Sequence, residues 1–408
     1  MFLASRFRQA YRYRFYCTIA STANSSEAGT GQSTWPGPFS PSSRVESRPV
    51  LARLKAEENP ERILEICRSA SLNPEASIDR ICFSITVSKL TAAKQFESIR
   101  QLLEELKTRP DFNENDGFAC HVIIWYGQAN MLEDAILTFK QLDQLGITRS
   151  VKSLYALLVA CQMAKNYEEL CRIFCEFPKT YGIEPNLETY NMGIKAFCIA
   201  GKSSSAYSIL TEMDRKGVKP DEATFGNLLA GFYNEEKLED VGKVLQLMVQ
   251  YGIKPGLTTY NIRIQSLCKM KKSSEAKALL GGMMSRGVQP NTATYCHLIH
   301  GFCKEGRFNK AIKLFGDMRT KGMKPTATCH FTLISFLCEG EHFVKAFWAT
   351  KRCIKHGWIP PYSVMTRLAN GLISISKFDD AKFLIKHIKQ KFKINNAQWD
   401  EIEAKLPS

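Results

Sequence analysis

The amino-acid sequence predicts an all-α protein, built as a right-handed α-solenoid of about nine helix-turn-helix units of 35 residues each. Three observations predict this fold. The chain aligns with itself at a shift of 35 residues, each shifted segment holds two apolar stripes with helical spacing, and most segments end in Gly-x-x-Pro. Because one helical hairpin cannot bury both of its faces, neighbouring hairpins are expected to stack into a solenoid with a concave inner surface.

The 35-residue register is clearest in the middle of the chain. Four segments open with a threonine followed by an aromatic residue, at Thr189-Tyr190, Thr224-Phe225, Thr259-Tyr260 and Thr294-Tyr295. The glycines of the Gly-x-x-Pro endings are Gly217, Gly252, Gly287, Gly322 and Gly357. Glycine suits the left-handed position that ends a helix, and proline cannot continue one. Extended outward, the register predicts a solenoid over residues 80–395.

The segment 291–325 shows how one unit is built. Its first apolar stripe consists of Tyr295, Leu298, Ile299, Phe302 and Cys303. Its second stripe consists of Phe308, Ala311, Ile312, Phe315 and Met318. Both stripes have the i, i+3, i+4, i+7 spacing of an amphipathic helix, and the Gly306-Arg307 turn separates them. Each unit is therefore predicted to be a hairpin of two helices.

The two ends of the chain differ from the solenoid. Residues 1–26 contain four arginines, no lysine and no acidic residue, with Phe and Tyr interleaved, which favours a mitochondrial transit peptide over a disordered basic tail. A Ser, Thr, Gly and Pro-rich stretch follows and is expected to remain unfolded, so that residues 1–48 form transit peptide and linker. Residues 50–79 are predicted to be capping helices, and residues 396–408 a C-terminal cap.

Composition limits the partners and the chemistry. The formal net charge of +15 makes a polyanion such as RNA a plausible partner. None of the fourteen cysteines forms a C-x-x-C motif, and Cys198, Cys268, Cys303 and Cys338 share one place in the repeat. We expect these cysteines to pack between hairpins, with no metal site and no cofactor. No apolar run reaches the length of a membrane span, so no membrane insertion is expected.

These features resemble the pentatricopeptide repeat family, an RNA-binding class of helical solenoids in plant organelles. The resemblance rests on the 35-residue period, the T-Y-N-x-x-I openings, the central alanine and the G-x-x-P endings. The tetratricopeptide repeat, with its 34-residue period and W-x-x-L-G-x-x-Y opening, does not match. In the family, the fifth and the last residue of one unit are implied to read one RNA base together.

Two units carry residue pairs that match this implied role. Asn191 with Asp221 resembles a uridine reader, and Asn261 with Asn291 resembles a pyrimidine reader. The other units do not offer a familiar pair, so we expect poor sequence selectivity. Asp221 and Asn291 also suit a second role as helix N-caps. Lys269 and Lys304, late in first helices, are expected either to contact phosphates or to lie on a solvated surface.

The resemblance implies a non-catalytic protein without a small-molecule substrate. The stretches 61–81, 182–191 and 258–280 resemble the pentatricopeptide proteins of the small subunit of plant mitochondrial ribosomes. We therefore expect a protein of the mitochondrial matrix that contacts ribosomal RNA and small-subunit proteins by shape and charge. The alternatives are a transcript-specific factor that stabilises, processes or promotes translation of one organelle messenger, and a solenoid adaptor that binds proteins.

Overall fold

The computed structural model describes residues 43–71, 80–109, 112, 116–391 and 396–406. The proposed transit peptide lies outside the described residues. The chain divides into two compact units, residues 1–105 and 106–408, and each unit is described by itself.

The first unit holds α2 (Ser43–Ala56), α3 (Pro60–Ser71), α4 (Arg80–Ala92) and most of α5 (Phe96–Lys107). Helices α2, α3 and α4 pack on one another. Arg68 of α3 forms an ion pair with Glu105 of α5 at 2.6 Å. α2 begins at Ser43, whereas the sequence places the start of structure near Val50. α2 and α3 occupy the segment predicted to hold capping helices.

The second unit consists of successive hairpins with a last helix after them. The hairpins are α6 (Asp116–Gln128) with α7 (Leu132–Gln141), α8 (Val151–Met163) with α9 (Tyr167–Tyr181), α10 (Leu187–Ile199) with η2 (Ser203–Ser205) and α11 (Ala206–Arg215), α12 (Glu222–Asn234) with α13 (Leu238–Gln250), α14 (Leu257–Lys269) with α15 (Ser273–Ser285), α16 (Thr292–Lys304) with α17 (Phe308–Thr320), α18 (Ala327–Glu339) with α19 (Phe343–Lys355), and α20 (Tyr362–Ser374) with α21 (Phe378–Lys391). The last helix is α22 (Asn396–Glu403). The fold class predicted from the sequence, consecutive helical hairpins with a 35-residue period, is confirmed.

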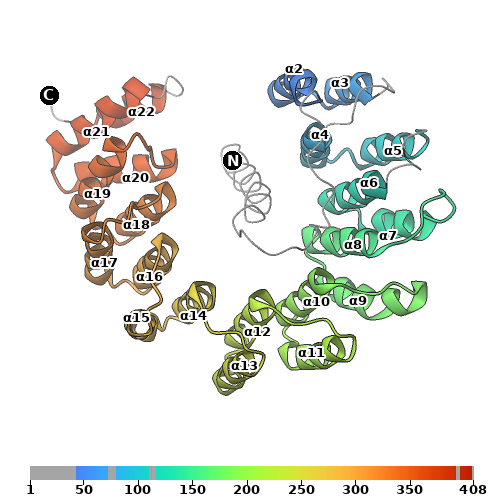
Figure 1. The fold of residues 1–408 in the computed structure, drawn as a ribbon. Coiled ribbons are helices and arrows are strands. Elements are labelled where there is room, and N and C mark those ends of the chain that lie inside the picture. Colours follow the sequence, from blue (N-terminus) through green and yellow to red (C-terminus); the bar gives the residue numbers. More distant parts are fainter. Residues whose placement is uncertain (1–42, 72–79, 110–111, 113–115, 392–395, 407–408) are drawn as a thin grey trace. The chain divides into compact units, whose positions relative to one another are not determined.

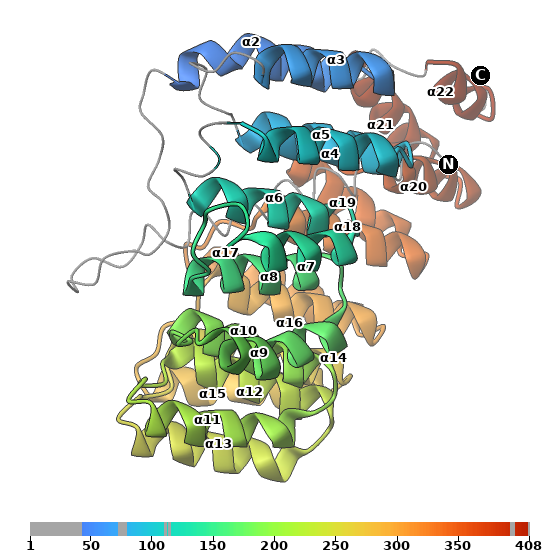
Figure 2. The ribbon, with the colours of Figure 1, turned by 90° about the vertical axis from the view of Figure 1, so that its right-hand side faces the viewer.

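The first helices of the hairpins form one continuous layer within the second unit. α6 packs on α8, and the same contact repeats from each first helix to the next as far as α20. Each second helix packs on its own first helix, and most also contact the first helix that follows (Figure 1). Figure 2 shows the hairpins from α6 to α13 stacked in chain order. The base-reading and phosphate-binding candidates all lie on or beside the first helices.

The 291–325 unit shows why the hairpins form where the sequence places them. α16 and α17 span the two predicted stripes, and Tyr295, Phe302, Ala311 and Phe315 have no more than 1% of their surface exposed. Gly322 has a φ of 75°, the left-handed conformation that ends a helix at little cost only for glycine. Pro325 follows as part of the connection to the next hairpin, so the chain restarts its pattern after every second helix.

Cysteine and glycine permit close approach between successive first helices. Cys198, Cys268, Cys303 and Cys338 are at most 4% exposed, so their predicted packing between hairpins is confirmed. A Cβ atom built on Gly301 of α16 would lie 2.5 Å from Cys268 Sγ and 2.6 Å from Ser273 Oγ. A Cβ atom built on Gly231 of α12 would likewise overlap the side chains of Cys198 and Ser203. The helix backbone at these places therefore has no room for a side chain.

All thirteen cysteines in the described part of the chain are free thiols. Within the same residues, no group of three or more His, Cys, Asp and Glu side chains is arranged to hold a metal ion. No described helix combines the length and the apolar character that crossing a bilayer requires.

Replacing Gly301 with alanine should destabilise the second unit by about 1–3 kcal/mol, because the new methyl group overlaps Cys268 and Ser273. Gly281→Ala in α15 is the matched control, since its Cβ would meet nothing within 4 Å. That control should be neutral or stabilising by up to about 1 kcal/mol, because alanine is the better helix former. Urea unfolding of the full chain measures both. Equal stability of the two variants would contradict the packing described.

Candidate nucleic-acid interface

The last residue of a unit stands directly before the first helix of the next unit, where it acts as an N-cap. Asp221 precedes α12 and Asn291 precedes α16, and both have extended backbone conformations. The Asp221 carboxylate accepts a hydrogen bond from the Thr224 backbone N–H at 2.8 Å, and Asn291 accepts from Thr294 at 3.1 Å. In both units the threonine hydroxyl accepts a hydrogen bond in return, which completes a capping box. The cap hypothesis for Asp221 and Asn291 is confirmed.

Asn191 of α10 joins the first of these caps. Its Nδ2 donates to Asp221 Oδ1 at 3.1 Å, although the two residues are 30 positions apart. The Thr224 hydroxyl donates to Asn191 Oδ1 at 2.6 Å, and Asn227 donates to the Asn191 backbone carbonyl at 3.2 Å. Both members of the predicted pair are thus held in place at the α10–α12 contact. One N–H of the Asn191 amide and the second carboxylate oxygen of Asp221 make no hydrogen bond to the described residues, so both can face a ligand.

Asn261 and Asn291 repeat this arrangement at the contact between α14 and α16. Asn261 Nδ2 donates to Asn291 Oδ1 at 3.4 Å, and the Thr294 hydroxyl donates to Asn261 Oδ1 at 2.6 Å. Asn291 is exposed and Asn261 is half-buried, whereas Thr294 is fully buried. The two members of each residue pair implied by the family resemblance are therefore in contact in the structure.

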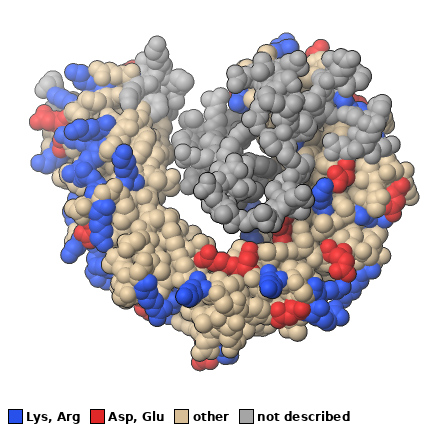
Figure 3. Space-filling view, viewed as in Figure 1, with Lys and Arg blue, Asp and Glu red and all other residues tan. Residues whose placement is uncertain are grey.

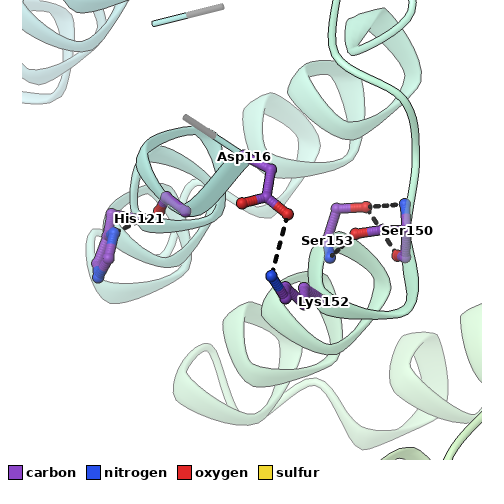
Figure 4. A network of polar contacts seen from close by, with 6 residues as sticks. Asp116, His121, Ser150, Lys152 and Ser153 are labelled. Atoms are coloured by element: carbon purple, nitrogen blue, oxygen red, sulfur yellow. Dashed lines mark hydrogen bonds and ion pairs between the residues drawn. The ribbon is translucent and has the colours of Figure 1, made fainter. Parts of the chain in front are cut away.

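Other units use the same two positions for packing and capping. Ser150 caps α8 through Ser153, and Lys152 of the same helix pairs with Asp116 of α6 at 3.4 Å (Figure 4). In the unit 222–256, the fifth and the last residue are Gly226 and Gly256, which have no side chain to read a base or to cap a helix. Here Glu222 of α12 supplies the cap, accepting from the backbone N–H of Thr259 at 3.3 Å and from its hydroxyl at 3.1 Å.

The unit that follows Asn291 replaces the Asn–Thr contact with two thiols. Cys296 occupies the fifth position, Thr326 caps α18, and Cys329 occupies the third helical position. The interaction between the two thiols lowers the pKa of Cys296 and raises that of Cys329. These side chains hold α16 to α18 and lack the amide that matches a base edge.

The two candidate lysines lie at the last residues of neighbouring first helices. Lys269 ends α14 and Lys304 ends α16, and both are exposed. Burial lowers the pKa of His297, and the nearby charges of His300 and Lys269 lower it further. Burial also lowers the pKa of His300, and the positive charge of Lys304 lowers it further. Near neutral pH both histidines are therefore neutral, and the lysines carry the positive charge here.

Acidic side chains occupy another part of the first-helix layer. Glu188 of α10 is exposed, and Asp221 and Glu222 are half-buried beside α12. Figure 3 shows acidic residues gathered over this region. Negative charge beside the Asn191–Asp221 pair opposes the approach of a phosphate backbone.

Sequence reasoning did not single out two residues of the layer. Lys195, one helical turn after Asn191, is half-buried, and burial alone lowers its pKa. Its only sequence signal is a positively charged residue four positions after the candidate base-reading residue Asn191. Glu222 was also missed, because its capping of α14 depends on a contact across 37 residues.

The fold defines a helical-repeat protein. A model described as "PPR repeat family" matches residues 185–234, 256–304 and 290–339, and a model described as "Pentatricopeptide repeat domain" matches residues 137–198. A mitochondrial pentatricopeptide repeat-containing protein of Arabidopsis thaliana is 56% identical over 367 residues, which cover 90% of each chain. The chain belongs to the pentatricopeptide repeat family, and it is a mitochondrial protein. Since the repeats are those of a non-catalytic family, the chain is not an enzyme.

More distant relatives include two proteins of Arabidopsis thaliana. Small ribosomal subunit protein mL103 is 32% identical over 196 residues, covering 48% of this chain and 46% of the relative. Small ribosomal subunit protein mS78 is 32% identical over 169 residues, covering 41% and 42%. Each of these two matches thus spans less than half of the relative's length.

Replacing Asp221 with alanine should lower the free energy of unfolding by about 1–2 kcal/mol, because α12 loses its cap and Asn191 loses an acceptor. Asp221→Ser should recover most of that loss, since serine also caps helices. Urea unfolding of the full chain at neutral pH compares the variants. An alanine variant as stable as the original chain would show that the cap does not hold the α10–α12 contact.

Proposed function

We propose that the chain is a non-catalytic RNA-binding component of the small subunit of the mitochondrial ribosome, located in the matrix. One observation carries the RNA-binding mode. The positions that would read bases serve as helix caps or packing groups in most units, so the solenoid contacts folded RNA by shape and charge. The ribosomal assignment rests on the similarity to mL103 and mS78, whose names place them in the small ribosomal subunit.

The Asn191–Asp221 and Asn261–Asn291 pairs are the proposed base contacts. Their hydrogen bonds with threonine orient the side chains before any RNA arrives, so little side-chain entropy is lost on binding. Each well-formed base contact discriminates by only about 1–3 kcal/mol. Two such contacts cannot select one transcript, and they fit a local role at an exposed pyrimidine of a larger RNA.

These two ordered pairs also support a second candidate, a factor that acts on one organelle messenger. That function requires compliant pairs in most units. The glycines at 226 and 256 and the thiol at 296 lack the amide or carboxylate that such pairs need.

Sedimentation of a mitochondrial extract tests the ribosomal proposal. The protein should migrate with ribosomes at moderate salt and with the small subunit after EDTA separates the subunits. Migration with a light particle that contains one messenger would replace the proposal with the transcript-specific function. An RNase-insensitive complex without ribosomal proteins would indicate a protein adaptor.

Changing both Lys269 and Lys304 to alanine should weaken binding to folded ribosomal RNA and reduce the slope of log affinity against log salt by up to about two units, since each phosphate contact releases counterions. Filter binding of the purified chain across a salt series measures this slope. A variant with Lys216 and Lys243 changed to alanine loses the same charge at exposed ion pairs and serves as the control. Identical slopes in the two variants would assign Lys269 and Lys304 to the solvated surface.

A further inference from the structure

The positive charge of the chain is concentrated in its last hairpins. Residues 304–391 contain seventeen Lys and Arg and six Asp and Glu, so this segment accounts for eleven of the fifteen net positive charges. Figure 3 shows Lys and Arg gathered over the part of the second unit that runs from α16 to α21. The candidate phosphate-binding residue Lys304 is the first residue of this segment and lies on a first helix. Nearly all the other Lys and Arg of the segment lie on second helices or on the connections between helices.

Many of these cations lie on the exposed sides of the second helices. On α19, Lys345, Trp348, Lys351 and Lys355 recur at a spacing of three or four residues, opposite the buried Ala346, Ala349, Thr350 and Cys353. Lys313 of α17 and Lys386 of α21 are exposed on the helices to either side. We call Lys313, Lys345, Trp348, Lys351, Lys355 and Lys386 the second-helix face.

Contacts between the helices hold this face together. Lys345 Nζ donates to Asn309 Oδ1 of α17 at 2.8 Å. Phe347 of α19 and Phe383 of α21 lie edge to face with ring centroids 5.9 Å apart. The Lys351 ammonium lies 4.5 Å from one of these rings and 4.8 Å from the other. The three helices therefore present their cations on one connected surface.

Among the described residues, no carboxylate forms an ion pair with a cation of the second-helix face. Of the Lys and Arg between 304 and 391 whose side chains are described, Arg307 and Lys389 form ion pairs. Earlier in the second unit, carboxylates pair with Arg149, Lys152, Arg172, Lys216, Lys237 and Lys243. An unpaired cationic surface is available to phosphates, which displace only bound counterions.

Trp348 lies exposed among these charges. Its side chain is 39% exposed, and the Arg352 guanidinium carbon lies 4.0 Å from the ring centroid. Packing within the chain thus leaves part of this large apolar ring in water. Indole rings and guanidinium planes both stack on unpaired nucleic-acid bases, and stacking contributes about 1–3 kcal/mol per base.

We propose that the second-helix face is an additional RNA-binding surface, separate from the first-helix layer, which holds the phosphate backbone of a folded RNA while Trp348 stacks on an unpaired base beside the RNA helix. Charge complementarity selects this occupant over a protein, because a protein partner would need an equally extended acidic surface. The inference rests on the proposed RNA-binding function and identifies which side of the hairpins carries it.

The test uses the purified full chain and a mixed-sequence RNA hairpin with a short unpaired overhang. Replacing Lys313, Lys355 and Lys386 with glutamine should weaken binding about tenfold or more near 0.1 M salt and reduce the salt slope by about two to three units, since three phosphate contacts are lost. Trp348→Ala should weaken binding to the hairpin with the overhang and leave binding to the blunt hairpin unchanged.

The matched control replaces Lys152, Lys216 and Lys243 with glutamine, which removes the same charge from three exposed ion pairs on other helices. This control should keep nearly the original affinity and slope. Equal weakening in both triple variants would show a general charge effect and overturn the inference.

Further outcomes separate the inference from the proposed function. If the original chain does not bind the hairpin, RNA binding itself fails. If it binds and the face variant binds equally well, only the inference fails. A face variant that keeps RNA affinity but no longer sediments with ribosomes would assign the face to a protein. One that loses only binding to vesicles of anionic phospholipid would assign it to a membrane surface.

Discussion

The contact between successive first helices is the constraint on which the second unit depends. Helix α14 packs on α12 and α16 of the neighbouring hairpins as well as on its own partner α15, so no hairpin completes its core alone. The approach is so close that Gly301 has no room for a methyl group beside Cys268. Small residues at this contact, with the Gly-x-x-Pro connections that restart each hairpin, determine where the side chains of the layer lie.

The same contact explains why the chain is better suited to recognise the shape of a folded RNA than its base sequence. The residue that ends each unit lies at the junction of two hairpins, and there its first task is to cap a helix and bind the previous one. Asp221 and Asn291 perform that task and retain polar atoms for a ligand. Glu222 caps α14 and Thr326 caps α18, where the Cys296 and Cys329 thiols replace the Asn–Thr contact, so neither junction has a base-reading pair. The positive charge lies away from these junctions, chiefly on the exposed sides of α17, α19 and α21.

Local patterns predicted most of the fold. Helical spacing of apolar residues predicted α16 and α17, and the shared repeat position predicted the burial of Cys268 and its equivalents. The paired positions 191 with 221 and 261 with 291 followed from the family resemblance. Contacts across more than thirty residues were not predictable, because they depend on how closely two helices approach. Counting charges along the chain finds the basic C-terminal segment, but ion pairing and exposure become visible only when the helices are packed.

The most direct test of this account is selection from a random RNA pool with the purified full chain at physiological salt. Binding by contour and charge predicts that the enriched RNAs share folded structure and have at most two pyrimidines in common, with one nucleotide between them because one unit separates those of Asn191 and Asn261. Enrichment of one defined unpaired sequence long enough to span most of the units would contradict it.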